Sequence, residues 1–328
     1  MTSNEYRALD AINQSRLKLL LHHPQKYLSA YDDSEERTHF LFGQFVEDAL
    51  IQDDDYLDER YYITKADTPS ESVLKVLKLL AHQSKTNDLS EIDYDVLVQA
   101  CRVCGYGKSW KDETCVSKLL DLGSDYYYEL KRAEGKIRID QANYDLGMKI
   151  SSEALTNPIT AYLFDPKRAE ANDCSILFKK VLKFTYRTRE CKGEIDLLHI
   201  DHKNKTVRVY DIKTSAQAMF FQSTILKYRY DFQVYFYSLG AYYCNLVPAD
   251  YTILTPRFIV LDSRGELPAT IWDAPSHVDN RITADFEYNG RVYEGIDSAF
   301  NRLDFHIESD HGVIQWSITN KGQCHGRN

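Results

Sequence analysis

The chain has 328 residues, and its 40 basic and 49 acidic side chains give a formal net charge of −9 at pH 7. This acidic balance excludes a surface that binds nucleic acid all over, so any DNA binding must use a local basic strip. The sequence contains no run of 18 apolar residues and no basic-then-apolar signal pattern at its start. We therefore expect neither a membrane span nor a secretory signal.

The first part of the chain, residues 1–170, reads as mostly helical. An Asn-Gln-Ser sequence at 13–15 precedes a leucine-rich stretch, which predicts a capped helix that ends before Pro24. Residues 40–51 place apolar side chains on one helical face. Further helical patterns lie at 72–82, 92–104 and 125–132.

Strand patterns replace helical ones from Ser175 onward. Three strands are predicted at 175–186, 193–200 and 206–213, with a polar hairpin turn at 201–205. Two helices at 216–226 and 228–246 follow, and then a buried strand at 257–261. This order predicts a mixed α/β fold.

We treat residues 1–328 as one domain, in which 1–170 form a mostly helical N-terminal portion, 175–262 an α/β core and 263–328 a mixed C-terminal region without a readable motif.

Charged side chains follow apolar ones on the third predicted strand. Alternation places four side chains on one face: Val207, Val209, Asp211 and Lys213. Burying the last two is costly unless they pair or bind a metal ion. Asp196 lies in a similar apolar setting on the preceding strand. Two carboxylates and a lysine at the open end of a small sheet predict a site for Mg²⁺ or Mn²⁺.

Such a site fits the hydrolysis of a phosphodiester bond. Asp196 and Asp211 would hold one or two ions, which lower the pKa of a bound water. Lys213 would orient or help to deprotonate that water and would stabilise the developing negative charge. The alternative interpretation is a simple Asp–Lys ion pair on a solvated hairpin face.

Three motifs occur in order along the chain: Gly193-Glu194-Ile195-Asp196, Asp211-Ile212-Lys213 and Gln233 to Tyr237. They resemble the G-x-x-D, D-x-K and Q-x-x-x-Y signature of the RecB-like branch of the PD-(D/E)XK nuclease superfamily. The stretches 15–18, 23–27, 40–43 and 227–238 are similar to the exodeoxyribonuclease VIII (RecE-like) exonucleases of phages and prophages. The resemblance covers most of the chain and is dense around 193–240.

The resemblance implies a restriction-endonuclease-like core, with a mixed central sheet flanked by helices. It implies that Asp196 and Asp211 are metal ligands, that Lys213 is the catalytic lysine, and that the carbonyl of Ile212 is an additional ligand. Gln233 and Tyr237 are four residues apart and share a helix face. They would reach the DNA end or the lysine; alternatively, that face packs on the sheet.

The helix after Gly43 departs from the family pattern. The RecB-like branch usually carries a metal-binding His on this helix, and the corresponding residue here is Glu47. Members that resemble the lambda-type exonucleases use an acid there, so the resemblance favours Glu47 as a metal ligand. Asp48 flanks the apolar stripe on its other side. Periodicity alone does not choose between the two acids.

Basic residues precede two of the motifs. One group leads into the second strand of the predicted core: Lys179, Lys180, Lys183, Arg187, Arg189 and Lys192. The other, Lys227 and Arg229, precedes the Gln233 helix. Both could line a channel for DNA phosphates. The alternative is a solvated hairpin edge, where lysine discourages strand pairing.

Cysteine spacing indicates neither of two common metal centres. Cys101, Cys104 and Cys115 lack a fourth ligand at zinc spacing, so we expect no zinc site. Only Cys244 and Cys324 follow the core, whereas the iron–sulfur cluster of some RecB-like nucleases needs three cysteines there. Seven cysteines at irregular spacing predict reduced thiols in a cytoplasm.

The resemblance implies a Mg²⁺- or Mn²⁺-dependent exonuclease that degrades duplex DNA from an end. Exonucleases of this type form homo-oligomeric rings and act in phage recombination with a single-strand annealing partner, which here would place the chain in a host cytoplasm. Two alternatives stay open: an endonuclease of the same fold, and a noncatalytic DNA-binding or assembly protein.

Overall fold

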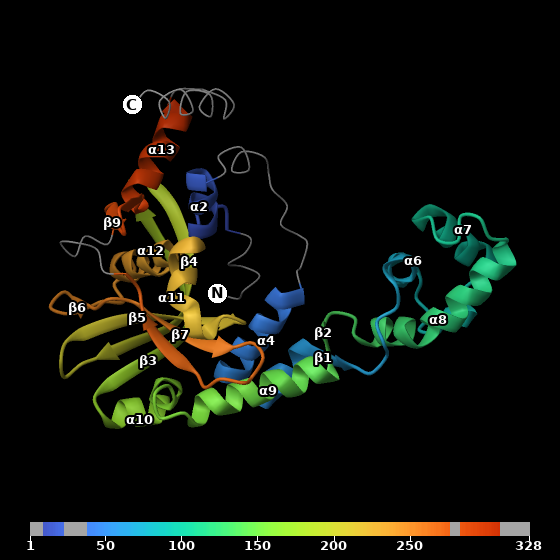
Figure 1. Cartoon of the computed structure of the whole chain (residues 1–328), viewed down its shortest axis with the longest axis horizontal. Helices are drawn as coiled ribbons and strands as arrows, with labels where there is room; N and C mark the ends of the chain where they lie inside the picture. Colours follow the sequence, from blue (N-terminus) through green and yellow to red (C-terminus); the bar gives the residue numbers. More distant parts are fainter. Residues whose placement is uncertain (1–8, 23–37, 276–282, 309–328) are drawn as a thin grey trace. The chain divides into compact units, whose positions relative to one another are not determined.

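The structure, a computed structural model, describes residues 9–22, 38–275 and 283–308 (Figure 1). It divides into two compact units. The core unit consists of the described residues up to Ile51 and from Lys149 onward, and the helical unit consists of Gln52–Met148. From the sequence we predicted one domain, and the division into these two units was not predicted. No helix among the described residues is long and apolar enough to cross a membrane.

A six-stranded sheet organises the core unit (Figure 1). Its strands are β3 (Cys174–Tyr186), β4 (Arg189–Asp201), β5 (Thr206–Ser215), β6 (Thr252–Ile253), β7 (Arg257–Asp262) and β8 (Thr270–Asp273). The order is β3-β4-β5-β7-β8, and β6 also pairs with β5. Strand β5 is parallel to β6 and β7, and the other pairs are antiparallel. The mixed α/β class and the four principal predicted strands are confirmed.

Helices flank this sheet. They are α2 (Gln14–His22), α4 (Thr38–Ile51), α10 (Pro166–Ala171), α11 (Phe221–Lys227), α12 (Tyr230–Tyr243) and α13 (Ile296–Glu308), with 3-10 turns η2 (Ala161–Phe164) and η3 (Ala218–Phe220). The predicted cap of α2 is confirmed, because the Asn13 side chain accepts the backbone N–H of Arg16 at 2.8 Å. A hairpin of β9 (Phe286–Tyr288) and β10 (Arg291–Tyr293) precedes α13. The sequence analysis assigned neither this hairpin nor α13.

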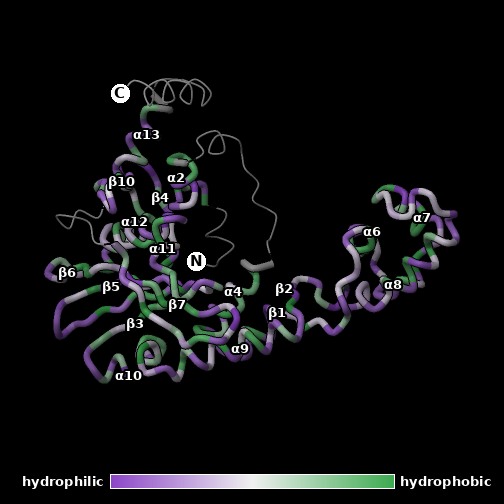
Figure 2. The backbone as a smooth tube through the Cα atoms, viewed as in Figure 1, coloured by the Kyte–Doolittle hydropathy of each residue, from purple (hydrophilic) through white to green (hydrophobic). Residues whose placement is uncertain are grey.

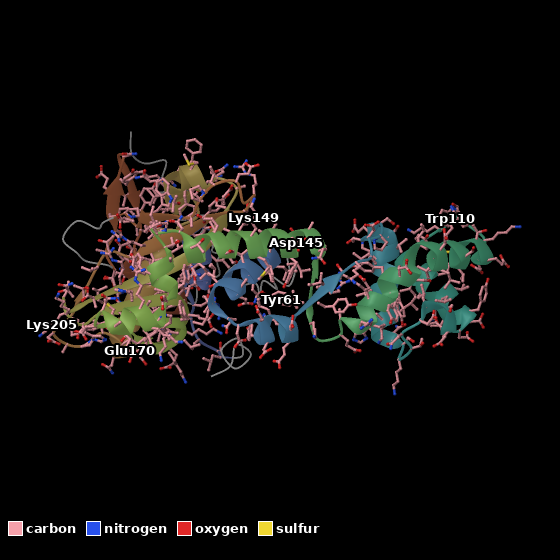
Figure 3. The ribbon with its side chains drawn as sticks, turned by 90° about the horizontal axis from the view of Figure 1, so that it is seen from below. Tyr61, Trp110, Asp145, Lys149, Glu170 and Lys205 are labelled. Carbon is pink, nitrogen blue, oxygen red and sulfur yellow. The ribbon has the colours of Figure 1, made fainter. Side chains whose placement is uncertain are left out.

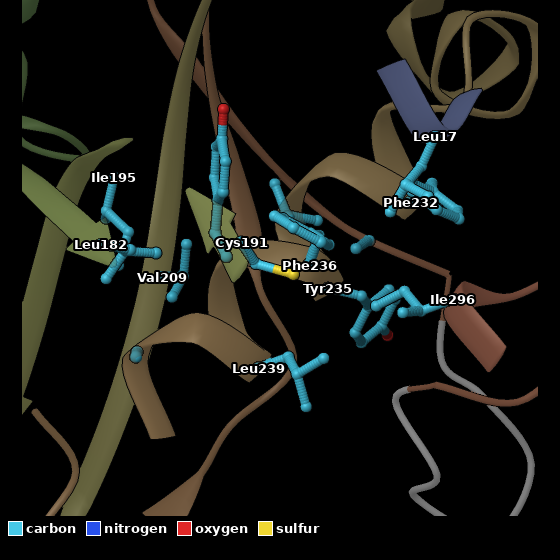
Figure 4. Close-up of a cluster of buried hydrophobic side chains, with 14 of the residues drawn as sticks. Leu17, Leu182, Cys191, Ile195, Val209, Phe232, Tyr235, Phe236, Leu239 and Ile296 are labelled. Carbon is cyan, nitrogen blue, oxygen red and sulfur yellow. The ribbon is translucent and has the colours of Figure 1, made fainter. Parts of the chain in front are cut away.

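The core of this unit lies between the sheet and α12 (Figure 4). Leu182, Ile195 and Val209 contribute from the strands, and Phe232 and Phe236 from α12. Helix α12 is buried on nearly every side, which its almost continuous apolar and aromatic sequence requires. The helix is therefore fixed firmly against the strands that carry the predicted acids.

The helical unit has its own hydrophobic core. Its elements are α5 (Asp54–Arg60), β1 (Tyr61–Thr64), α6 (Glu71–Gln83), η1 (Leu89–Glu91), α7 (Tyr94–Cys104), α8 (Asp112–Arg132) and β2 (Ile137–Asp140), followed by α9 (Gln141–Thr156). Figure 2 shows hydrophobic and hydrophilic residues alternating along α6, α7 and α8, as expected for helices with one buried face. The three predicted helices are confirmed, and α8 is longer than predicted.

Two features of the helical unit have no signal in the sequence analysis. Strands β1 and β2 pair in parallel, with Tyr61 opposite Ile137. The buried Glu129 carboxylate of α8 accepts the backbone N–H groups of Lys65 and Ala66 just after β1. Figure 3 labels Tyr61 at the start of β1 and Trp110 just before α8. The Trp110 ring packs edge-on against Tyr106, with 5.5 Å between centroids.

Candidate active site

The predicted acids of β4 and β5 lie side by side where these two strands separate. The antiparallel ladder ends at the pair Leu197–Tyr210. Asp196 precedes Leu197 on β4 and Asp211 follows Tyr210 on β5, so each acid lies one residue beyond the last pair. Beyond that pair the Asp196 carboxylate replaces a backbone carbonyl as hydrogen-bond acceptor, because its Oδ2 accepts the N–H of Ile212 at 2.9 Å. A polar side chain therefore continues the strand pairing at the place where the sheet opens.

Asp211 is 1% exposed and has partners on two sides. Its Oδ1 accepts a hydrogen bond from Gln233 Nε2 at 2.9 Å. Its Oδ2 lies 2.5 Å from the Lys213 ammonium as an ion pair, but accepts no hydrogen bond of good geometry from the described residues. The Lys213 ammonium is thus the cation that this buried oxygen already faces.

The Gln233 helix and the Gly193 strand fit together. Gln233 Nε2 also contacts the Tyr237 hydroxyl, at 3.2 Å. A Cβ atom at Gly193 would lie 3.1 Å from two carbons of the Tyr237 ring, so the aromatic side chain needs a glycine beneath it. The sequence analysis expected this helix face to reach the DNA end or the lysine. In the structure Gln233 holds Asp211, and Tyr237 packs on β4.

Helix α4 brings a further acid to the strands. A Cβ atom at Gly43 would lie 2.9 Å from Thr214 Oγ1, so the helix approaches the end of β5 closely at this glycine. One turn later, the Glu47 carboxylate contacts the ammonium of Lys179 on β3. The structure thus brings Glu47 to the strand acids, as the resemblance implies. Asp48 is buried.

Lys179 lies among carboxylates that the sequence analysis did not connect with it. Its Nζ lies 3.4 Å from Asp196 Oδ1 and 3.9 Å from Glu194, besides its contact with Glu47. Its backbone has φ = 46°, a left-handed conformation within a strand. The sequence predicted that Lys179 contacts DNA phosphates. Its ammonium instead faces these carboxylates, and no pattern in the sequence indicated that arrangement.

An aromatic ring lies beside two ammonium groups. Lys213 Nζ is 5.1 Å from the centroid of the Tyr230 ring, and Lys18 Nζ, from α2, is 5.9 Å from the same centroid. Cation–π contacts of this kind stabilise ammonium groups that are partly removed from water. Lys18 was not singled out from the sequence, although it belongs to the 15–18 stretch that resembles the exonucleases.

The acids of the site have unequal proton affinities. Burial raises the pKa of Asp211 to about 6; Asp196 adds to this rise, whereas Lys213 opposes it. Burial, together with the Asp196 charge, also raises the pKa of Glu47. Burial acts in the same direction on Asp196, but the attraction of Lys179 and further hydrogen bonds outweigh it, so the pKa of Asp196 is lowered. Asp196 is therefore the acid held most firmly as a carboxylate.

The lysines differ in the same way. Burial disfavours the charge on Lys213, but Asp211 and Asp196 outweigh burial and raise its pKa. Lys179 follows the same pattern, since Asp196 and Glu47 raise its pKa despite burial. Burial and the repulsion from Lys213 lower the pKa of Lys18 to about 8. At neutral pH, Lys213 is thus an ammonium that can donate hydrogen bonds and stabilise negative charge, but not a base.

Glu47, Asp196 and Asp211 do not form a complete set of metal ligands in the structure. In the part of the chain that the structure describes, no three His, Cys, Asp or Glu side chains are arranged to hold a metal ion. Glu47 and Asp196 meet at the ammonium of Lys179, and Asp211 meets Lys213. The oxygen donors have the chemistry that Mg²⁺ and Mn²⁺ prefer.

Two of the predicted phosphate contacts are buried in the core unit. Arg229 is 4% exposed, forms a buried ion pair with Asp231 and donates to the Glu294 carbonyl, so its prediction as a DNA contact is corrected. Lys192 is 7% exposed and donates to the Leu9 carbonyl at 2.7 Å, which gives it a structural role instead.

The remaining basic candidates keep exposed or half-exposed charges. Arg187 pairs with Asp297, and Arg189 pairs with Asp304, both on α13. Lys227 lies over the exposed ring of Tyr228. Lys180 and Lys183 lie on β3. For these five, contact with DNA stays a prediction.

The cysteines in the described part of the chain have free thiols. Cys101 and Cys115 are buried in the helical unit, and burial, with a hydrogen bond to Cys115, raises the pKa of Cys101 to about 12. The Cys101 thiol therefore stays protonated and behaves as a small apolar side chain. Cys324 lies outside the described residues, as do His23, Pro24 and Tyr27 of the exonuclease-like stretches.

A comparison of the chain with models of known protein families gave no match, and a comparison with curated proteins also gave none.

Proposed function

We propose that the protein is a metal-dependent deoxyribonuclease of the PD-(D/E)XK type that degrades DNA from duplex ends. One observation carries the proposal. Asp196, Asp211 and Lys213, which belong to separate motifs, converge at the point where β4 and β5 part, and Gln233 of the third motif holds Asp211. The alternative of a solvated Asp–Lys pair does not fit a carboxylate that is 1% exposed.

Asp211, Asp196 and Glu47 would hold the metal, with the Ile212 carbonyl as a further candidate ligand. A bound Mg²⁺ or Mn²⁺ supplies neutralisation of the phosphate charge and a water of lowered pKa. Oxygen donors from three carboxylates suit these hard cations better than they suit zinc.

Other side chains of the site would position the water and the metal ligands and stabilise negative charge. Lys213, held as an ammonium by Asp211, would orient the attacking water and stabilise the charge that develops on the phosphate. Gln233 fixes the rotamer of Asp211 through the hydrogen bond to Oδ1, and Tyr237 supports the Gln233 amide. The exposed Lys227 and the β3 lysines Lys180 and Lys183 would contact the DNA backbone.

The test uses purified full-length protein, end-labelled linear duplex and closed circular DNA, with Mg²⁺ or with EDTA. We expect loss of label from the linear duplex with Mg²⁺ and none with EDTA. Asp211→Asn and Lys213→Met should each lower the rate by at least about 10³-fold, because each removes a group on which the chemistry depends. Asp201→Asn, at the end of β4, is the matched control and should leave the rate unchanged.

Full activity of the Asp211→Asn protein would overturn the proposal. Nicking of the circular substrate would instead identify an endonuclease with the same site. Oligomer formation and an annealing partner belong to the same proposal by resemblance, and sedimentation of the purified protein measures the first directly.

A further inference from the structure

Lys18 of α2 carries a positive charge that no acid of the described residues neutralises. Within that part of the chain its ammonium forms no ion pair and donates no hydrogen bond. Asp211, whose charge favours the ammonium, is paired with Lys213. Asp231, which acts in the same direction, is paired with Arg229. Removing an ammonium from water without an anionic partner is unfavourable, so this position indicates an anion that the described residues do not supply.

The Tyr230 ring stabilises this ammonium without cancelling its charge. The ring centroid lies 5.9 Å from Lys18 Nζ and 5.1 Å from Lys213 Nζ. A cation–π contact attracts an ammonium through the quadrupole of the ring and brings no negative charge. Burial raises the pKa of the Tyr230 hydroxyl, so the ring is neutral at neutral pH. The ring thus holds two ammonium groups at one place, and the charge of Lys18 remains available to an anion.

Helix α2 fixes the position of Lys18. The neighbouring Leu17 is fully buried and anchors the helix in the hydrophobic core. In Figure 4 Leu17 lies beside Phe232 of α12, the helix that also carries Tyr230. Lys18 itself is half-buried, so the residue keeps some contact with solvent. Burial and the repulsion from Lys213 lower its pKa, and a charge retained at such a cost to stability is typical of a functional site.

We propose that Lys18 and Lys213 together bind one phosphate group, and that in the proposed nuclease this is the phosphate of the scissile bond. Lys213 is already paired with Asp211, so Lys18 supplies the unbalanced positive charge, and a phosphodiester supplies the single negative charge that matches it. Hydrogen bonds from an ammonium to a phosphate oxygen are charge-assisted and stronger than neutral ones. The identity of the phosphate rests on the proposed function, whereas binding of a phosphate group can be measured without metal or DNA.

The test titrates the full-length protein with inorganic phosphate by calorimetry, at low salt and with EDTA. The native protein should bind phosphate. Lys18→Met should bind it at least about tenfold more weakly, because a hydrogen bond from a charged group is lost. Lys18→Arg keeps the charge and the donors and should bind like the native protein. Lys203→Met removes an exposed lysine from the turn between β4 and β5 and is the control, with native affinity. With Mg²⁺ and duplex DNA, Lys18→Met should also lower kcat/KM by at least about tenfold.

A native protein that binds no phosphate would overturn the inference, and so would equal phosphate affinities of Lys18→Met and the native protein. An equal loss of affinity in Lys203→Met would also overturn it, because the effect would then be one of net charge. If Lys18→Met does not fold, as judged by circular dichroism, Lys18→Gln replaces it. The proposed function is judged separately. Should the native protein bind phosphate through Lys18 but degrade no DNA, the proposed function fails while the phosphate site stands.

Discussion

The amide of Gln233 donates a 2.9 Å hydrogen bond to Oδ1 of Asp211, and this contact ties helix α12 to the last buried acid of β5. Because α12 is packed on nearly every side, the amide cannot move far, and the carboxylate is held in one rotamer. In the proposed nuclease, Gln233 would therefore position Asp211 rather than contact the substrate.

Replacement of Gln233 by Ala should lower the rate of DNA cleavage by about 10–100-fold without unfolding the protein, which is the usual effect of losing a support behind a metal ligand. The apparent affinity for Mn²⁺ should fall with it. Initial rates on end-labelled duplex and calorimetric Mn²⁺ titrations measure the two effects. Gln222→Ala, on the exposed side of α11, is the control. An unchanged rate for Gln233→Ala would remove this role.

Gly43 and Thr214 should show strong energetic coupling. An alanine Cβ at 43 would lie 2.9 Å from Thr214 Oγ1, and such overpacking costs about 1–3 kcal/mol, which exceeds the gain of about 1 kcal/mol in helix propensity. Gly43→Ala should therefore destabilise the native protein. In the Thr214→Ala background the same change should stabilise it. Urea unfolding of the four proteins in this double-mutant cycle measures the coupling, and additive effects would contradict the close approach.

Lys18 should destabilise the protein at neutral pH. Its pKa is lowered from 10.5 to about 8 by burial, so the folded state binds a proton less strongly than the unfolded state. The cost is complete below pH 8 and disappears as the pH rises toward 10.5, where the unfolded chain also loses the proton. Lys18→Met should be more stable by on the order of 1–3 kcal/mol at pH 7.

Urea unfolding at pH 7 and at pH 9.5 measures this difference for Lys18→Met and for the exposed control Lys203→Met. The stability difference between Lys18→Met and the native protein should shrink at the higher pH, while that of the control stays near zero. A difference that does not depend on pH would show that packing, and not the charge, is responsible.

Arg229 and Lys227 should respond in opposite ways, although both precede α12. Arg229→Met leaves the buried Asp231 carboxylate without its ion-pair partner and should cost about 3–5 kcal/mol of stability. Lys227→Met should change stability by less than about 0.5 kcal/mol. It should weaken DNA binding, and the slope of log K against log salt concentration should become shallower by about one. Urea unfolding and DNA binding at several salt concentrations separate the two. Native stability of Arg229→Met would contradict the buried pair.

The sequence predicted the parts of this fold whose side chains repeat with a clear period. The strands around Asp196 and Asp211 alternate or are rich in β-branched residues, and the helix around Gly43 has one apolar face, so local patterns were enough. The convergence of Asp196, Asp211 and Lys213 also followed from alternation and from the short turn between the strands.

What the sequence could not predict depends on contacts between distant residues. Lys179 and Glu47 are separated by 132 positions, and a left-handed residue within a strand has no composition signal unless it is glycine. Arg229 looked like a surface cation because its partner Asp231 and the Glu294 carbonyl are recognised only in three dimensions. The helical unit was read correctly as helices, but its independent core is a property of packing.

The hydrogen bond from the Ile212 N–H to Asp196 Oδ2 has a consequence for coordination chemistry. That oxygen substitutes for a main-chain acceptor in the sheet, so giving it to an ion would leave a strand amide without an acceptor. In the proposed site, Asp196 would therefore offer an ion Oδ1 alone, and a carboxylate that binds the ion through both oxygens would have to be another one.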